Sequence, residues 1–328
     1  MSAQNGSTRR ETLLGATILG VSSAAGLPGA LAPSAANAQS NTTPTFRPTN
    51  FKDQLLYQRA FEAVLWALPA ADTLVMRRAQ REWGMKEGAV FYFENRPTGK
   101  TEVVTFNNET PYIFGTLTTR NGPLVFDVPA AGAKAKFSGS IFDLWYFPME
   151  DVGPVGADGG KGGKYLVLPP DNKETVPNGY IPLHSRTYDV HMLLRSIPAD
   201  EGDEGWRAAV AYAKTLKLYP LSEAGAPRPT EFIDATAKPF HGTPNFDLSY
   251  FDYIDETVQN EPVFEYDKVM IGCSPALASR RGSHSSRTPE PLPSSIAQCA
   301  MQSCTLSIRW RRWRRLANRF GPIAAGEC

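Results

Sequence analysis

Two carboxylates and a few polar and aromatic neighbours are the side chains best placed for chemistry in this sequence. Glu109 lies in a polar stretch, 107–112, between two strand-like segments, and Asp143 lies within a long apolar segment. A carboxylate in apolar surroundings is costly unless it is paired, and Arg195, near the end of another apolar segment, is the expected partner of Asp143. These residues predict a pocket in which Glu109 or Asp143 acts as a general acid or base.

Ligand contacts are expected from the neighbours of the two carboxylates. The predicted ligand-binding residues are Asn107, Thr110, Tyr112, Trp145 and Arg195. A second interpretation needs no ligand. Asn107 and Thr110 then cap a turn while Tyr112 fills the core. In that case Asp143 and Arg195 form a buried ion pair.

Other familiar motifs are absent or incomplete. The glycine-rich stretch 153–164 resembles a phosphate-binding loop, but Asp158 and Tyr165 occupy the positions of its required glycine and hydroxyl. Its glycines favour a flexible turn before a strand. The chain has no Gly-x-Ser-x-Gly elbow. The histidines before residue 273 lack the spacing of a metal site, so we expect no metal and no cofactor.

The net charge of +1 hides two unlike regions of the chain. The 328 residues include 34 basic and 33 acidic side chains. Residues 39–272 carry a net charge of −7, whereas residues 273–328 carry +7 and all four cysteines. The acidic region argues against nucleic acid as its partner. We expect a small polar ligand or a polymer instead, and the sequence predicts no oligomeric state.

Hydrophobic spacing predicts a mixed α+β fold. Residues 51–83 have the three- and four-residue spacing of helices, with a break expected near Pro69 and a stop at Gly84. Short runs rich in β-branched and aromatic residues then predict strands at 89–93, 102–106, 112–118, 123–128, 136–147, 164–168, 179–183 and 186–197. Strands without intervening helices favour an antiparallel, two-layer β-sandwich over 84–200. Asn121-Gly122 is typical of a hairpin turn.

The region after the strands is predicted to be helical and loop-rich over 201–272. A helix is expected at 206–216, a proline-rich loop region at 220–250, and a pair of helices at 246–272. The sandwich would therefore have helical segments on both sides of it in the sequence.

The first 50 residues are typical of an exported bacterial protein. Paired arginines, Arg9 and Arg10, precede a short apolar run, and Ala36-Asn37-Ala38 offers a cleavage site. These features resemble a twin-arginine signal peptide over 1–38, followed by a linker at 39–50. The apolar run is too short to span a membrane, so we expect no transmembrane segment and a periplasmic or secreted protein.

The last region, 273–328, differs in composition from everything before it. Lysine is absent, while arginine, serine and cysteine become frequent. We interpret it as a disordered tail that derives from a shifted reading frame. A genuine basic tail and a disulfide-bonded extension are the alternatives.

Four motifs in a fixed order resemble the bacterial DUF1254 family. They are Asn107-x-Glu109-Thr110-x-Tyr112, the segment 122–129, Phe142-Asp143-Leu144-Trp145, and the segment 162–170. The family usually has an aspartate where this chain has Glu109. The resemblance implies an immunoglobulin-like β-sandwich with helices. It also implies a second β-rich domain, DUF1214, which this sequence lacks, so the chain is expected to be truncated.

The family resemblance supplies a fold and no reaction, so two classes of function stay open. We favour a periplasmic binding or structural module for a small molecule or a polymer. The alternative is a metal-independent, hydrolase-like enzyme that uses Glu109, Asp143 and Arg195 in a cleft. The enzyme requires these three residues and Tyr112 to meet at one cavity.

Overall fold

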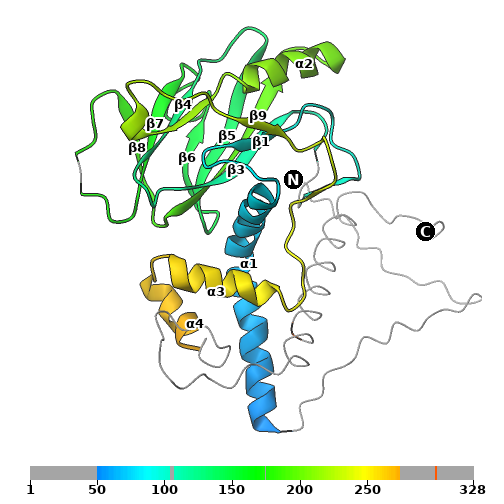
Figure 1. Cartoon of the computed structure of the whole chain (residues 1–328), viewed down its shortest axis with the longest axis vertical. Coiled ribbons are helices and arrows are strands. Elements are labelled where there is room, and N and C mark those ends of the chain that lie inside the picture. The colour runs from blue at the N-terminus through cyan, green and yellow to red at the C-terminus, as the bar shows by residue number, and fades with distance from the viewer. Residues whose placement is uncertain (1–49, 104–106, 174, 274–299, 301–328) are drawn as a thin grey trace, which may run out of the picture. The chain divides into compact units, whose positions relative to one another are not determined.

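A long helix, α1 (Phe51–Glu82), begins the part of the chain that the computed structural model describes, residues 50–103, 107–173, 175–273 and 300 (Figure 1). The predicted signal peptide, all of the linker but Asn50 and nearly all of the tail lie outside the described residues. The Asn50 side chain caps α1 by accepting a hydrogen bond of 2.9 Å from the Asp53 backbone N–H. Gly84, in the left-handed region at φ +67°, follows the helix as expected.

The predicted break at Pro69 is wrong, because α1 continues through this residue. Proline removes the hydrogen bond to the carbonyl of Leu65, four residues earlier. Leu65 lies on an exposed side of the helix, where water can solvate a freed carbonyl. Small buried residues on both sides of Pro69, including Ala63, Ala67 and Ala71, hold the two halves of α1 against the same core.

The strands form two main sheets and a small third sheet. The six-stranded sheet has the order β11 (Phe232–Asp234), β1 (Val90–Tyr92), β3 (Tyr112–Thr118), β9 (Asp189–Pro198), β5 (Ala135–Asp143) and β6 (Pro148–Val152). The four-stranded sheet has the order β10 (Lys217–Pro220), β4 (Leu124–Val128), β7 (Gly163–Leu168) and β8 (Tyr180–His184). β12 (Phe240–His241) pairs with β2 (Thr101–Glu102). The predicted α+β class is confirmed.

The pairing differs from the sequence prediction in two respects. Three pairs, β1 with β11, β7 with β8 and β2 with β12, are parallel because long connections bring the later strand back in the same direction. Asn121-Gly122 does not form a hairpin, since β3 and β4 on either side of it belong to different sheets. The turn therefore passes the chain from one layer of the sandwich to the other.

One apolar core lies between the two main sheets. Phe126 of β4 and Tyr165 of β7 share a cluster of buried side chains with Ile141 of β5 and with Met192 and Leu194 of β9. All five are less than 2% exposed. Burial of this size is the main stabilising contribution to a sandwich.

The opposite face of the six-stranded sheet faces α1. In the register of β3 and β9, Thr116 lies opposite His191 and Thr118 lies opposite Asp189. The Thr116 hydroxyl donates a 2.9 Å hydrogen bond to the carbonyl of Thr73 on α1. Side chains that alternate along β3 and β9 are thereby directed at the helix.

Three further helices complete the described residues: α2 (Gly202–Ala213), α3 (Tyr250–Asn260) and α4 (Lys268–Cys273), together with the short turns η1 (Leu221–Glu223) and η2 (Glu265–Asp267). α2 packs on β9 and β5, and α3 packs on α1 (Figure 1). The Tyr250 hydroxyl of α3 donates to the carbonyl of Val64 at 3.1 Å. No helix within the described ranges combines the length and the apolar character that crossing a membrane requires.

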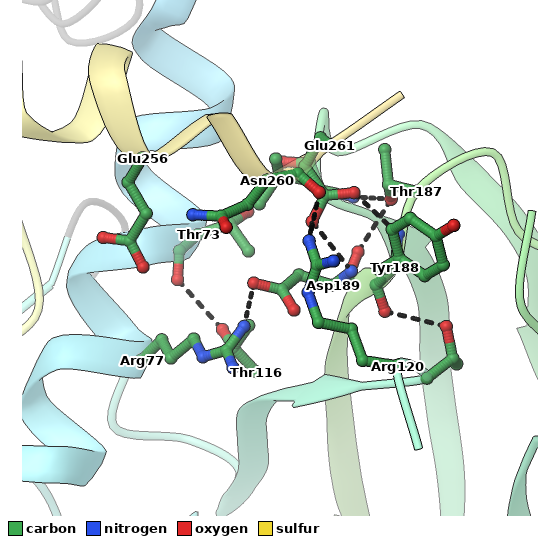
Figure 2. A network of polar contacts seen from close by, with 12 residues as sticks. Thr73, Arg77, Thr116, Arg120, Thr187, Tyr188, Asp189, Glu256, Asn260 and Glu261 are labelled. Atoms are coloured by element: carbon green, nitrogen blue, oxygen red, sulfur yellow. Dashed lines mark hydrogen bonds and ion pairs between the residues drawn. The ribbon is translucent and has the colours of Figure 1, made fainter. Parts of the chain in front are cut away.

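A buried polar network joins α1, the end of α3 and the start of β9 (Figure 2). Arg77 of α1 pairs with Asp189. Glu261, directly after α3, accepts hydrogen bonds from the backbone N–H groups of Tyr188 at 2.7 Å and Asp189 at 3.1 Å. Burial, together with the negative charge of Asp189, raises the pKa of Glu261 to about 7. Arg120 lies 3.5 Å from the Glu261 carboxylate and partly offsets that repulsion.

The predicted flexible glycine turn is an ordered loop around a buried carboxylate. Asp158 accepts hydrogen bonds from the Gly153 N–H at 2.7 Å, the Gly162 N–H at 3.1 Å and the Tyr165 hydroxyl at 2.8 Å. Gly162 has φ +76°, and a Cβ there would lie 2.6 Å from the Ala130 nitrogen. Glycine is needed at this position for both reasons.

Candidate functional site

A cavity of about 70 Å³ lies between α1 and the helix-facing side of β3 and β9. Its lining residues are Asp72, Met76, Phe93, Val103, Asn107, Tyr112, Phe114, Tyr146, His191 and Leu193. Apolar and aromatic walls thus surround a small set of polar groups, which is the usual composition of a ligand pocket.

Asp72 is the charged group of the cavity. It lies on α1, one turn before Met76, which lines the same cavity. Burial raises the pKa of the Asp72 carboxyl to about 6, and an interaction with the Tyr146 hydroxyl lowers it in part. The Oδ1 atom of Asp72 is buried and has no hydrogen-bond partner among the described residues. An unpaired buried oxygen of this kind is a strong acceptor for a donor that enters the cavity.

Tyr146 reaches the cavity from a tight turn between β5 and β6. Its φ of +58° lies in the left-handed region, which costs a residue other than glycine about 1 kcal/mol or more. The Asp143 side chain holds the turn by accepting hydrogen bonds from the N–H groups of Trp145 at 2.9 Å and Phe147 at 3.0 Å. The single strand predicted at 136–147 is therefore wrong, since β5 ends at Asp143.

Asp143 pairs with Arg186, which corrects the predicted pair with Arg195. The Arg186 Nε donates to Asp143 Oδ2 at 2.8 Å, and the Asp143 side chain is fully buried. Asp143 lies opposite Val190 on the neighbouring strand, five residues from Arg195. Five residues span roughly 16 Å along a strand, which is beyond the reach of the Arg195 side chain. The function of Asp143 here is to shape the turn that presents Tyr146.

His191 is a neutral group at the cavity wall. Complete burial lowers the pKa of its imidazole to about 4. Its Nδ1 lies 3.4 Å from the Thr116 hydroxyl oxygen. That hydroxyl donates its own proton to the carbonyl of Thr73. The Nδ1 atom of His191 therefore carries the proton that it shares with the Thr116 oxygen. Nε2 is then the acceptor nitrogen of the imidazole.

Two predicted ligand-binding residues, Asn107 and Tyr112, line the cavity. Asn107 also organises the turn before β3, because its Oδ1 accepts hydrogen bonds from the N–H groups of Glu109 at 2.7 Å and Thr110 at 3.3 Å. Its Nδ2 donates to the Tyr112 hydroxyl at 3.4 Å. The hydroxyl hydrogen of Tyr112 remains free to donate elsewhere. Turn formation and a place at the cavity are therefore compatible for Asn107.

The other predicted site residues do not line this cavity. Glu109 and Arg195 are exposed, and the Arg195 guanidinium lies 5.3 Å from the centre of the Tyr112 ring. Thr110 has a buried hydroxyl with no hydrogen-bond partner among the described residues. Trp145 packs against Trp66, with ring centres 5.0 Å apart. The predicted acid–base chemistry requires Glu109, Asp143 and Arg195 to meet at one cavity. They do not meet at this one.

Most residues that line the cavity lie in a stretch of the chain that matches a known protein family. The family model described as a protein of unknown function (DUF1254) matches residues 89–220. This stretch is a DUF1254 domain. The resemblance seen in the sequence motifs is confirmed. No functionally curated protein matches the chain.

Two crystal structures are among the solved structures that match the chain. The crystal structure of the VPA0106 protein from Vibrio parahaemolyticus has a TM-score of 0.52 and 15% sequence identity, and the match covers 78% of this chain. The chain spans 59% of the length of that structure, and the likeness supports the fold alone. A crystal structure of an uncharacterised protein from Burkholderia cenocepacia has a TM-score of 0.22 and 10% identity, covering 49% of this chain and 55% of the other.

The DUF1254 domain supplies most of the cavity, and α1 supplies the rest. Tyr146 and His191 belong to the domain, whereas Asp72 and Met76 precede it. The sequence does carry a pattern for Asp72, because Leu68, Asp72 and Met76 are spaced by four on one helix face. A carboxylate on an apolar helix face is costly unless it is paired, as holds for Asp143. No local pattern predicts the left-handed turn that presents Tyr146.

The described residues contain no cluster of three or more histidine, cysteine, aspartate or glutamate side chains able to hold a metal ion. The polar groups of the cavity are instead one carboxylate, two phenol hydroxyls, one amide and one neutral imidazole. Hydrogen bonding and ion pairing are the interactions that this set offers to a ligand.

Proposed function

We propose that the DUF1254 domain and α1 together form a binding module for a small amine, whose ammonium group pairs with Asp72. The observation that carries the proposal is the Oδ1 atom of Asp72. It is buried and has no hydrogen-bond partner among the described residues. An ammonium group supplies both a positive charge and N–H donors.

The surroundings of Asp72 favour a cation over an anion. The aromatic rings of Phe93, Tyr112, Phe114 and Tyr146 line the cavity, and ring faces attract ammonium groups. His191 carries no competing positive charge, because burial keeps its pKa near 4. The volume of about 70 Å³ restricts the ligand to a small amine.

A titration of the full chain tests the proposal. Near neutral pH, where Asp72 is ionised, propylamine should bind and the neutral analogue propanol should bind at least tenfold more weakly. Asp72→Asn should abolish amine binding, whereas the control Asp171→Asn, which changes an exposed carboxylate, should preserve it. Equal binding of the amine and the alcohol, or unchanged amine binding in Asp72→Asn, would overturn the proposal.

Export to the periplasm is a further part of the proposal. It is supported by Arg9, Arg10 and the apolar run that follows them in the sequence. Replacing both arginines with lysine should retain the protein in the cytoplasm of a bacterial host, as measured by cell fractionation. Unchanged delivery to the periplasm would refute use of the twin-arginine route.

A further inference from the structure

A second and larger hollow, the edge groove, lies where the two main sheets meet at one edge of the sandwich. Its volume is about 650 Å³, within the range of sites that hold small organic ligands. Strands β4 and β10 form one side, and the end of β3 with the segments 86–89 and 228–231 forms the other. No residue of the groove lines the Asp72 cavity.

The floor of the edge groove is apolar. Leu117 of β3, Phe126 of β4 and Leu218 of β10 line it, and all three also belong to the core between the sheets. The groove thus lies against the edge of the sandwich core, where these three residues are at most 6% exposed. An apolar chain laid along this floor would be removed from water, which favours binding.

A smaller hollow of about 170 Å³ continues the edge groove toward α1, and the two share Lys86, Glu87, Gly88, Leu117 and Thr118. Three cationic side chains lie at this end of the groove, two of them already paired with carboxylates. Arg77, Arg81 and Lys86 line the smaller hollow, with Glu87 as its only acidic group among the described residues.

The cations at this end retain hydrogen-bonding capacity. Arg77 pairs with Asp189 through its Nη1 atom. The Nη1 atom of Arg81 lies 3.4 Å from Oε1 of Glu256. A guanidinium has five N–H donors, so most of them remain. Lys86 has no ion pair within the described ranges.

Thr118 adds an independent indication of a ligand. The residue is only 7% exposed, and its buried Oγ1 has no hydrogen-bond partner among the described residues. Thr118 lines both the edge groove and the smaller hollow, at the point where they join. A buried hydroxyl without a partner is destabilising, and a ligand acceptor at the joint would relieve that cost.

We propose that the edge groove binds a monocarboxylate with an apolar chain. The carboxylate lies at the joint, where it accepts hydrogen bonds from Thr118 and Lys86 and interacts with the guanidinium groups behind them. The chain lies on the floor formed by Leu117, Phe126 and Leu218. Glu223 and Arg228 also line the groove, and they pair with each other at 2.6 Å, so together they add no net charge to it.

Titration of the full chain with decanoate, decanol and decyltrimethylammonium tests the site. Decanoate should bind at least tenfold more tightly than either analogue, because only the carboxylate matches the cations and the hydroxyl. Thr118→Val keeps the shape of the side chain and should weaken decanoate binding about tenfold. Lys86→Gln should weaken it by a similar factor, while the control Lys161→Gln, at the exposed glycine loop, should leave it unchanged.

Two results would overturn the proposal. The first is decanol binding as tightly as decanoate, which would mean that the groove selects for apolar surface alone. The second is unchanged decanoate affinity in both Thr118→Val and Lys86→Gln, with melting temperatures confirming that the variants fold. Asp72→Asn should leave decanoate binding intact, which separates this site from the proposed amine cavity.

Discussion

The Asp72→Asn substitution should stabilise the protein in a strongly pH-dependent way. Burial raises the pKa of Asp72 from 3.8 to about 6. Each pKa unit corresponds to about 1.4 kcal/mol, so ionised Asp72 costs the folded state about 3 kcal/mol. Asparagine occupies the same place without a charge and avoids this cost.

The direction in which wild-type stability changes with pH follows from proton binding. The folded state binds the Asp72 proton more tightly than the unfolded chain does, because the folded pKa is the higher one. Below pH 3.8 both states are protonated and the cost is absent. As the pH rises toward 6 the free energy of unfolding of the wild type falls, and above that value this contribution stays constant.

Urea unfolding followed by tryptophan fluorescence measures the effect. The stability difference between Asp72→Asn and the wild type should grow by about 2.5 kcal/mol between about pH 4 and about pH 7. Glu261 also titrates in this range, but it is common to both proteins and cancels in the difference. The control Asp171→Asn should show no comparable step, because its side chain is exposed. A difference that stays flat with pH would refute a buried, charged Asp72.

Three further predictions follow from the same structure. Arg186→Ala should destabilise the protein by about 3 kcal/mol in urea unfolding, because it leaves the fully buried Asp143 without its cation, and a loss below about 1 kcal/mol would contradict this pairing. Glu261→Gln should remove a decline in wild-type stability between about pH 4.5 and about pH 7, since the raised folded pKa makes ionisation unfavourable in that window; an unchanged slope would contradict it. Gly162→Ala should lower the melting temperature more than Gly179→Ala does, because both have positive φ but only Gly162 has backbone atoms within 3 Å of a new Cβ, and equal losses would argue against the crowding.

Much of the strand layout could be predicted from local sequence. β3 occupies Tyr112–Thr118, as the run of β-branched and aromatic residues indicates. The turn after β5 could not be predicted in this way, because 136–147 contains no proline and only one glycine, Gly139. That turn depends on Asp143, which is held by an arginine 43 residues later. Local propensity carries no information on such a partner.

The candidate site likewise contains residues that local sequence predicts and residues that only tertiary packing brings together. Asn107 and Tyr112 lie within one short motif, and an Asx turn makes their proximity predictable. Asp72 and Tyr146 are 74 residues apart, and only the packing of α1 on the sheet brings them together. Pro69 shows the converse, since a strong local preference for a break is overridden by burial on both sides of it.

The position of Asp72 outside the matched domain has a consequence for how binding specificity changes among proteins with this sandwich. The DUF1254 domain contributes the rings, the amide and the imidazole, whereas a separate helix contributes the charge. Substitutions on one turn of that helix would exchange the ligand class without disturbing any strand pairing. If the proposed amine binding holds, ligand preference would depend on a segment of the chain that strand pairing does not constrain.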